Sequence, residues 1–182
     1  MTSKAQPIGG YVFKSTDELL LDTNVWLSVY GPRKPGSAKA AVYSQALASM
    51  LKAQSRIFID VLIVSEFVNA YARLRYNILR SKGTASSDFK QFRRSVAFKP
   101  IAKDIAGDVK QVLKHCVRVD SGFSTLDIQA LIAEYEQGDS DLNDQVLAEL
   151  CKSKGLKLVT DDGDFGGHGL ALVTANKRLL GP

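Results

Sequence analysis

The sequence contains few of the residues that build soft-metal sites and histidine-based catalytic clusters. Among 182 residues there are two cysteines and two histidines. Cys116 and Cys151 lack the spacing of metal ligands, and we interpret them as small core residues in a reducing compartment. A histidine-rich metal site is therefore hard to build from this chain, and any chemistry must rest largely on carboxylates.

Long apolar runs are also missing. No stretch approaches the ~20 residues that span a bilayer, and Met1 to Gly10 lacks the apolar middle of a signal peptide. We therefore expect a cytoplasmic protein without a membrane partner. The apolar content of 45% is enough for one substantial core, and the length suits one domain. We expect residues 1–17 to be a flexible leader and residues 18–182 to form that domain.

Charge is distributed unevenly along the chain. Residues 71–103 contain nine Lys or Arg and one acid, whereas residues 134–164 contain nine acids and three lysines. A basic segment attracts phosphates, and an acidic cluster repels them unless it holds cations. The combination favours a metal site that acts on nucleic acid, although the basic segment alone is equally typical of a solvated helix face.

Short β-rich runs alternate with segments of helical spacing. The runs are predicted at 18–21, 56–60, 117–119, 156–160 and 171–174, and the main helices at 38–54, 63–79, 100–116 and 141–152. This alternation predicts an α/β fold with a parallel sheet. Ligands of such sheets bind at the carboxyl ends of the strands. Asp22 follows the first run, and Asp161, Asp162 and Asp164 follow the fourth.

Each of these acids has an ordinary structural explanation. Asp22 is able to cap a helix. Acids such as Glu66 and Asp144 are favourable in a first helical turn, and the residues Asp-Asp-Gly-Asp are typical of a turn. Together, however, the acids would converge on one edge of the sheet and repel one another. Oxygen ligands select hard cations, so the set predicts a site for Mg²⁺ or Mn²⁺.

Four segments, in this order, resemble the PIN-domain nucleases, among them the VapC-like toxin ribonucleases. They are Leu-Leu-Leu-Asp-Thr-Asn at 19–24, Val-Ser-Glu-Phe at 64–67, Asp-Leu-Asn-Asp-Gln-Val-Leu-Ala at 141–148 and Leu-Val-Thr-Asp-Asp-Gly-Asp-Phe at 158–165. The resemblance implies a three-layer α/β/α sandwich with a central, mostly parallel sheet of four or five strands. It also implies Mg²⁺- or Mn²⁺-dependent hydrolysis of RNA phosphodiester bonds.

The resemblance assigns a role to each matching residue. The catalytic and metal-binding acids would be Asp22, Glu66, Asp144 and Asp162, with Asp141 and Asp164 next in rank. Polar residues beside them would orient carboxylates or bound waters, or have a structural role: Thr23, Asn24, Ser65 and Thr160. The charge of the basic segment, and not the resemblance, predicts that the RNA backbone binds there, at Arg73, Arg75, Arg80, Arg93 and Arg94. Expected partners are RNA, a cognate antitoxin protein and a second copy of the chain.

Two other functions compete with a nuclease. The first is a non-catalytic nucleic-acid-binding module on the same fold, which the basic segment supports but which has no need of the acids. The second is a phosphatase with Asp22 as nucleophile. Such an enzyme needs an acid two residues later to protonate the leaving group, and Asn24 stands at that position. The acids therefore favour the nuclease.

Overall fold

The structure is a computed structural model that describes residues 4–32, 37–85, 88–138 and 141–181. Its strands are β1 (Lys4–Pro7), β2 (Glu18–Leu21), β3 (Arg56–Ile59), β4 (Val117–Arg118), β5 (Lys157–Val159) and β6 (Ala171–Thr174). Its α-helices are α1 (Thr23–Tyr30), α2 (Ala38–Lys52), α3 (Val61–Ser81), α4 (Phe89–Arg94), α5 (Phe98–Lys114), α6 (Ile128–Tyr135), α7 (Leu142–Lys154) and α8 (Lys177–Leu180). Two short 3₁₀ turns, η1 (Ile8–Gly10) and η2 (Gly163–Gly167), complete the elements.

The six strands form one parallel sheet in the order β1-β6-β5-β2-β3-β4. β2 lies at the centre, where Leu20 pairs with Phe58 on one side and with Leu158 on the other. The three leucines of β2 have no exposed surface. A parallel strand that is covered on both faces needs apolar side chains on both, which explains the continuous run Leu-Leu-Leu before Asp22.

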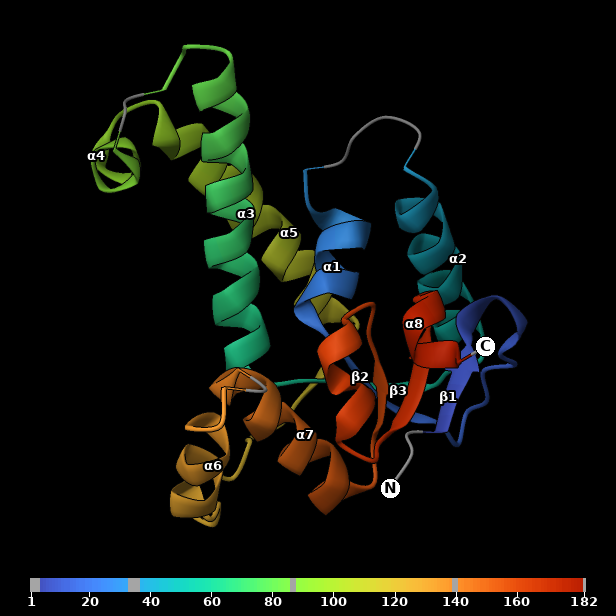
Figure 1. Cartoon of the computed structure of the whole chain (residues 1–182). Helices are drawn as coiled ribbons and strands as arrows, with labels where there is room; N and C mark the ends of the chain where they lie inside the picture. Colours follow the sequence, from blue (N-terminus) through green and yellow to red (C-terminus); the bar gives the residue numbers. More distant parts are fainter. Residues whose placement is uncertain (1–3, 33–36, 86–87, 139–140, 182) are drawn as a thin grey trace.

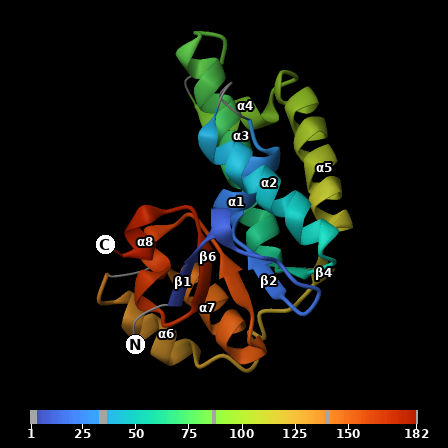
Figure 2. The ribbon, with the colours of Figure 1, turned by 90° about the vertical axis from the view of Figure 1, so that its right-hand side faces the viewer.

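Helices cover both faces of this sheet (Figures 1 and 2). The chain moves from β2 to β3 to β4 in one direction across the sheet and returns through β5 and β6 in the other. The right-handed rule for crossovers between parallel strands places α1, α2, α3 and α5, which connect β2 to β3 and β3 to β4, on one face. It places α6 and α7, which connect β4 to β5, on the other. The predicted three-layer α/β/α architecture is confirmed.

The first described residues differ from the flexible leader that we expected. Lys4–Pro7 forms the edge strand β1, paired with β6, and Ile8 and Phe13 are buried in the core. This strand brings the sheet to six strands, more than the four or five predicted. Its sequence is polar and ends in proline, which is compatible with an edge but carries no strand signal.

α3 and α5 extend beyond the sheet as an arm that α4 closes at its tip (Figure 1). Tyr76 packs against Phe89 and Phe92, and Phe92 packs against Phe98, with ring centroids 5.2 to 5.5 Å apart. The tip therefore has a small aromatic core of its own. Among the described residues, no helix has both the length and the apolar character to cross a membrane.

Candidate metal centre at the carboxyl ends of the strands

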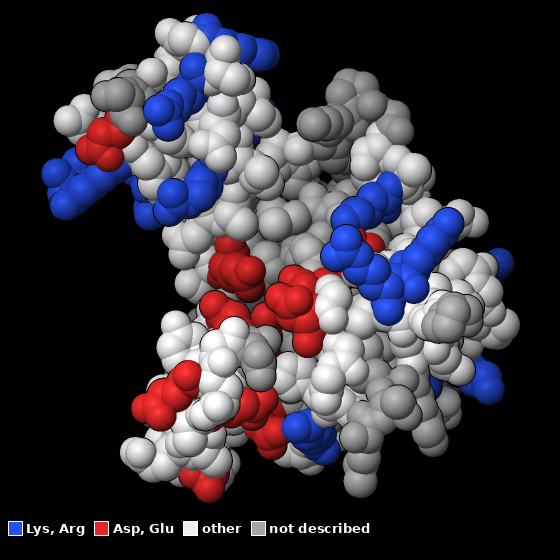
Figure 3. Space-filling model, viewed as in Figure 1, with Lys and Arg blue, Asp and Glu red and all other residues white. Residues whose placement is uncertain are grey.

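The four acids assigned by the motifs come from four elements and line one hollow of about 320 Å³. Asp22 follows β2 and caps α1, Glu66 lies on α3, Asp144 lies in the first turn of α7, and Asp162 follows β5. Figure 3 shows acidic side chains gathered in this hollow, between the arm and α6 with α7. The strand ends and helix starts therefore converge as the parallel sheet requires.

Asp22 is held by three donors and is only 5% exposed. Its Oδ1 accepts from the Thr23 amide at 2.6 Å. Its Oδ2 accepts from the Thr160 hydroxyl at 2.6 Å and from the Asn24 side-chain amide. Together these bonds fix the direction in which the carboxylate faces. The motif residues Asn24 and Thr160 thus lie where they orient the first acid.

Thr23 links the first two acids. Its backbone amide donates to Asp22, and its hydroxyl donates to Glu66 Oε2 at 2.9 Å. Glu66 itself is exposed and lies in the second turn of α3, because Asp60 starts that helix at Val61. The helix start predicted at residue 63 puts Glu66 in a first turn, where the helix dipole explains an acid. One turn further along, that explanation is weaker.

Burial and mutual repulsion raise the pKa values of two acids. Burial, reinforced by the charges of Glu66 and Asp162 and opposed by the Thr160 hydroxyl, raises the pKa of Asp22 to about 6. Burial likewise raises the pKa of Asp144 to about 7, with Asp22 and Asp162 the next contributors. The hollow therefore disfavours its own negative charges, which is the electrostatic condition that a bound cation relieves.

The chemistry of this set fits a hard divalent cation. Every charged side chain that lines the hollow is a carboxylate, and Asn24 and Asn143 add amide groups. As the side chains stand, no group of three His, Cys, Asp or Glu residues within the described parts of the chain closes around a single ion. An arrangement of carboxylates around an open hollow suits Mg²⁺, which keeps several of its waters when bound.

The structure separates the second-ranked residues. Asp141 lines the hollow and caps α7 through the Asn143 amide. Asp164 is exposed and does not line the hollow, although its amide donates to Asp162 Oδ1 at 3.1 Å. Ser65 is exposed and also lies outside the lining. Asp164 and Ser65 are therefore not brought to the site.

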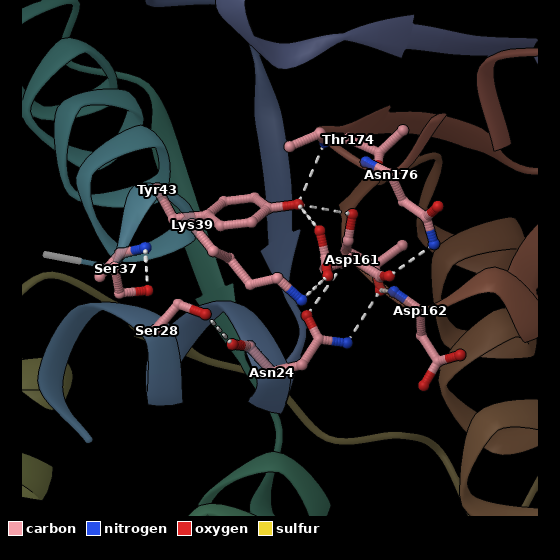
Figure 4. A network of polar contacts seen from close by, with 12 residues as sticks. Asn24, Ser28, Ser37, Lys39, Tyr43, Asp161, Asp162, Thr174 and Asn176 are labelled. Carbon is pink, nitrogen blue, oxygen red and sulfur yellow. Dashed lines mark hydrogen bonds and ion pairs between the residues drawn. The ribbon is translucent and has the colours of Figure 1, made fainter. Parts of the chain in front are cut away.

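Sequence reasoning missed two features of the site. Asn143 lines the hollow beside Asp144, and only its place in the Asp-Leu-Asn-Asp segment could have drawn attention to it. Lys39, Tyr43 and Asn176 surround Asp161 on the side away from the hollow (Figure 4). No local pattern links residues so far apart in the chain.

The predicted RNA-binding arginines lie on the arm, on α3 and α4. Arg75 is partly buried, and the others are exposed: Arg73, Arg80, Arg93 and Arg94. The guanidinium groups of Arg73 and Arg93 lie over the Phe89 ring, 4.7 and 5.9 Å from its centroid. In Figure 3 the basic side chains of the arm lie above the acidic hollow and separate from it. The positive and negative surfaces are thus neighbours without neutralising each other.

Comparisons with known proteins address the family directly. The PIN domain family model matches residues 19–169. The crystal structure of VapBC2 from Rickettsia felis bound to a DNA fragment from its promoter contains a chain of similar fold. That chain matches with a TM-score of 0.54 and 16% identity, over 86% of this chain and 97% of that chain. No functionally curated protein matches the sequence. The family match covers the strand-end acids and most of the chain, and the protein belongs to the PIN-domain family.

Proposed function

We propose that this protein is a metal-dependent endoribonuclease that hydrolyses RNA phosphodiester bonds at the acidic hollow. The observation that carries the proposal is the convergence of Asp22, Glu66, Asp144 and Asp162 from four elements on one hollow. Carboxylates brought together in this way raise one another's pKa values and cost stability unless a cation neutralises them. A pure binding surface for RNA would gain nothing from them.

These four carboxylates would hold Mg²⁺ or Mn²⁺, with Asp141 at the rim. A bound ion supplies positive charge that screens the phosphodiester and favours the loss of a proton from an attacking water. Thr160 and Asn24 keep the Asp22 carboxylate in one orientation, and Thr23 holds Glu66 beside it. Attack in line with the leaving oxygen would give products with a 5′-phosphate and a 3′-hydroxyl.

The arm would bind the RNA backbone. Its exposed arginines attract phosphates without reading sequence. The basic side chains of the arm and the acidic hollow lie on the same face of the molecule in Figure 3. A strand held by the arm would therefore pass over carboxylates that repel it until a cation neutralises them.

We further propose that the chain is the toxin of a toxin–antitoxin pair. The support is the resemblance of its motifs to the VapC-like ribonucleases and its fold likeness to a chain of the VapBC2 structure. A cognate antitoxin would cover the acidic hollow. Co-purification with the product of an adjacent small gene tests this role, and sedimentation measurements test the predicted homodimer.

The central experiment incubates the purified protein with single-stranded RNA and Mg²⁺, Mn²⁺ or EDTA, and repeats each assay with Asp22→Asn. The matched control is Glu134→Gln, which changes an exposed acid of α6 outside the hollow. We expect cleavage only with a divalent ion, its loss in Asp22→Asn and its retention in Glu134→Gln. Cleavage that survives EDTA would contradict the metal mechanism. Binding of RNA without any cleavage would favour the non-catalytic module.

A further inference from the structure

Asp161 lies between Thr160 and Asp162 in a run of acids, yet its carboxylate faces away from the hollow. Its Oδ1 accepts from the Tyr43 hydroxyl at 3.0 Å, and its Oδ2 pairs with the Lys39 ammonium. Figure 4 shows the Asp161 side chain directed toward α2, while the Asp162 side chain points elsewhere. The Asp161 carboxylate is therefore bound by two side chains of α2 and does not line the hollow.

The backbone of Asp161 is held as firmly as its side chain. Its amide donates to Asn24 Oδ1 at 3.0 Å, and its carbonyl accepts from the Asn176 side chain at 2.8 Å. The Tyr43 hydroxyl shares its one proton between Asp161 Oδ1 and the Thr160 carbonyl, 3.2 Å away, and accepts from the Ala175 amide at 3.1 Å. Asp161 thus joins α1, α2 and the segments that follow β5 and β6.

This anchoring reaches the acids of the hollow through two short paths. Because Asn24 Oδ1 accepts from the Asp161 amide, the Asn24 NH₂ group is turned toward Asp22 Oδ2 and the Thr160 hydroxyl. The Asp162 amide donates to the same Thr160 hydroxyl at 2.9 Å. The positions of Asp22 and Asp162 relative to each other therefore depend on the turn that Asp161 anchors.

Lys39 also matters for the charge balance. Without its ammonium, the Asp161 carboxylate would be a further uncompensated negative charge on the residue next to Asp162. The pair is partly solvated, with the Lys39 side chain 56% exposed and the Asp161 side chain 12% exposed. Solvent at the Lys39 end screens the pair and limits what it contributes to stability.

We propose that Lys39, Tyr43 and Asp161 form a clamp that positions Asp22 and Asp162 for metal binding, with Asp161 as a positioning residue and not a ligand. The proposal rests on the proposed function. Partners that orient metal ligands affect metal affinity by about ten- to a hundredfold. A misplacement of ~1 Å in a catalytic constellation is enough to cost about a hundredfold in rate.

The test compares Lys39→Met, Asp161→Asn and their combination in Mn²⁺ binding, measured by calorimetry without RNA. We expect each single variant to weaken Mn²⁺ binding by about tenfold or more. The double variant should bind no more weakly than the weaker single, because both changes break one contact. In cleavage assays, kcat should fall while the KM for RNA stays near that of the wild type. Lys39→Arg, which keeps the charge, should restore Mn²⁺ binding and rate.

The control is Lys152→Met, which breaks the exposed pair with Glu149 on α7 and should change neither quantity. Loss of Mn²⁺ binding in Asp161→Asn as complete as in Asp22→Asn would show that Asp161 is itself a ligand. Single variants that match Lys152→Met, or effects that multiply in the double variant, would also overturn the clamp.

A second measurement separates this proposal from the proposed function. Hydrogen exchange of the Asp162 amide, in metal-free protein, should be faster in Lys39→Met and Asp161→Asn than in Lys152→Met. If the wild type neither binds Mn²⁺ nor cleaves RNA, the nuclease proposal fails, and amide exchange still decides the clamp. Unchanged exchange in both variants would refute the clamp whatever the activity.

Discussion

Replacing Asp144 with asparagine should make the metal-free protein more stable while it abolishes metal binding. Asp144 lies in the first turn of α7 and faces the hollow. Burial, reinforced by the charges of Asp22 and Asp162, raises its pKa from 3.8 to about 7. The folded state therefore disfavours the charged form of this side chain, and the neutral amide removes that penalty.

The size of the effect follows from the pKa. At about 1.4 kcal/mol for each pKa unit, the shift corresponds to a ceiling of about 4 kcal/mol. The side chain is only partly buried, so solvent screening lowers the gain. An acid near a helix N-terminus is also favourable by about 0.3 to 1 kcal/mol, and asparagine loses this contribution. We therefore expect Asp144→Asn to raise the free energy of unfolding by about 2 kcal/mol at pH 8.

The sign of the pH dependence is fixed by the raised pKa. Above about pH 7 the wild-type carboxylate is charged and its cost is fully present. As the pH falls toward the unfolded value of 3.8, the folded state takes up its proton first and the cost disappears. The advantage of Asp144→Asn should therefore shrink toward zero near the acidic end of this range.

The assay is urea unfolding in EDTA, followed by circular dichroism at several pH values between about 4 and 8, the range over which this carboxylate titrates. Glu134→Gln, an exposed acid outside the hollow, serves as the control and should match the wild type. With Mn²⁺ at about a hundred times its Kd, the wild type should gain about 2.7 kcal/mol that Asp144→Asn does not gain. An Asp144→Asn protein that is less stable than the wild type in EDTA at pH 8 would refute the reasoning. So would an advantage that persists unchanged at acidic pH.

Three further changes probe other parts of the molecule. Lys157→Met removes the cation 2.6 Å from buried Asp17. Burial alone would raise the pKa of Asp17, but hydrogen bonds from Lys157 and Lys14 hold it below its ordinary value of 3.8. The substitution should lower the free energy of unfolding at pH 7 by about 1 to 3 kcal/mol, and this loss should shrink as the pH falls below 3.8. Gly155→Ala, at a C-cap with φ of 65°, should cost about 1 to 2 kcal/mol in thermal or urea unfolding, because L-residues disfavour the left-handed region. The double change Arg93→Glu with Arg94→Glu at the arm tip should weaken the binding of all RNA sequences alike, and RNA affinity should then depend less on salt concentration. Fluorescence anisotropy measures both effects, in protein that also carries Asp22→Asn to prevent cleavage.

Much of the fold could be predicted because its elements carry strong local patterns. The predicted run at 171–174 is β6 as observed, and the helix predicted at 38–54 is α2 with its end two residues earlier. β2 is an apolar run between charged ends, and α3 has one buried face. Patterns of this kind come from burial and need no knowledge of distant partners.

The elements that were missed lack such patterns. β1 is polar and exists because it pairs with β6, more than 160 residues later. α8 has four residues and no buried side chain, so its sequence offers no periodicity. Both depend on the edge of a sheet that is complete only when the whole chain is folded, which is information that a local window does not contain.

The site shows the same division. The four acids could be nominated from motifs, because each follows a strand or lies near the start of a helix. The direction in which each side chain points could not be predicted from the motifs. Asp161, Asp162 and Asp164 stand within four residues of one another, yet only Asp162 lines the hollow. The turn η2 and the contact of Asp161 with Lys39, 122 positions earlier, make that distinction.

The hollow combines firm geometry with unfavourable charge. The hydrogen bonds of Asp22 fix where its carboxylate faces, while the same burial that makes those bonds rigid raises its pKa to about 6. A carboxylate that only capped α1 would need the fixed orientation, but the fold would be more stable if burial did not raise its pKa. Under the proposed function, a bound cation would supply the missing positive charge at carboxylates that are already oriented. The proposed metal affinity and the cost of these charges in the metal-free fold would then have one origin, which is why a single substitution at Asp144 should move them in opposite directions.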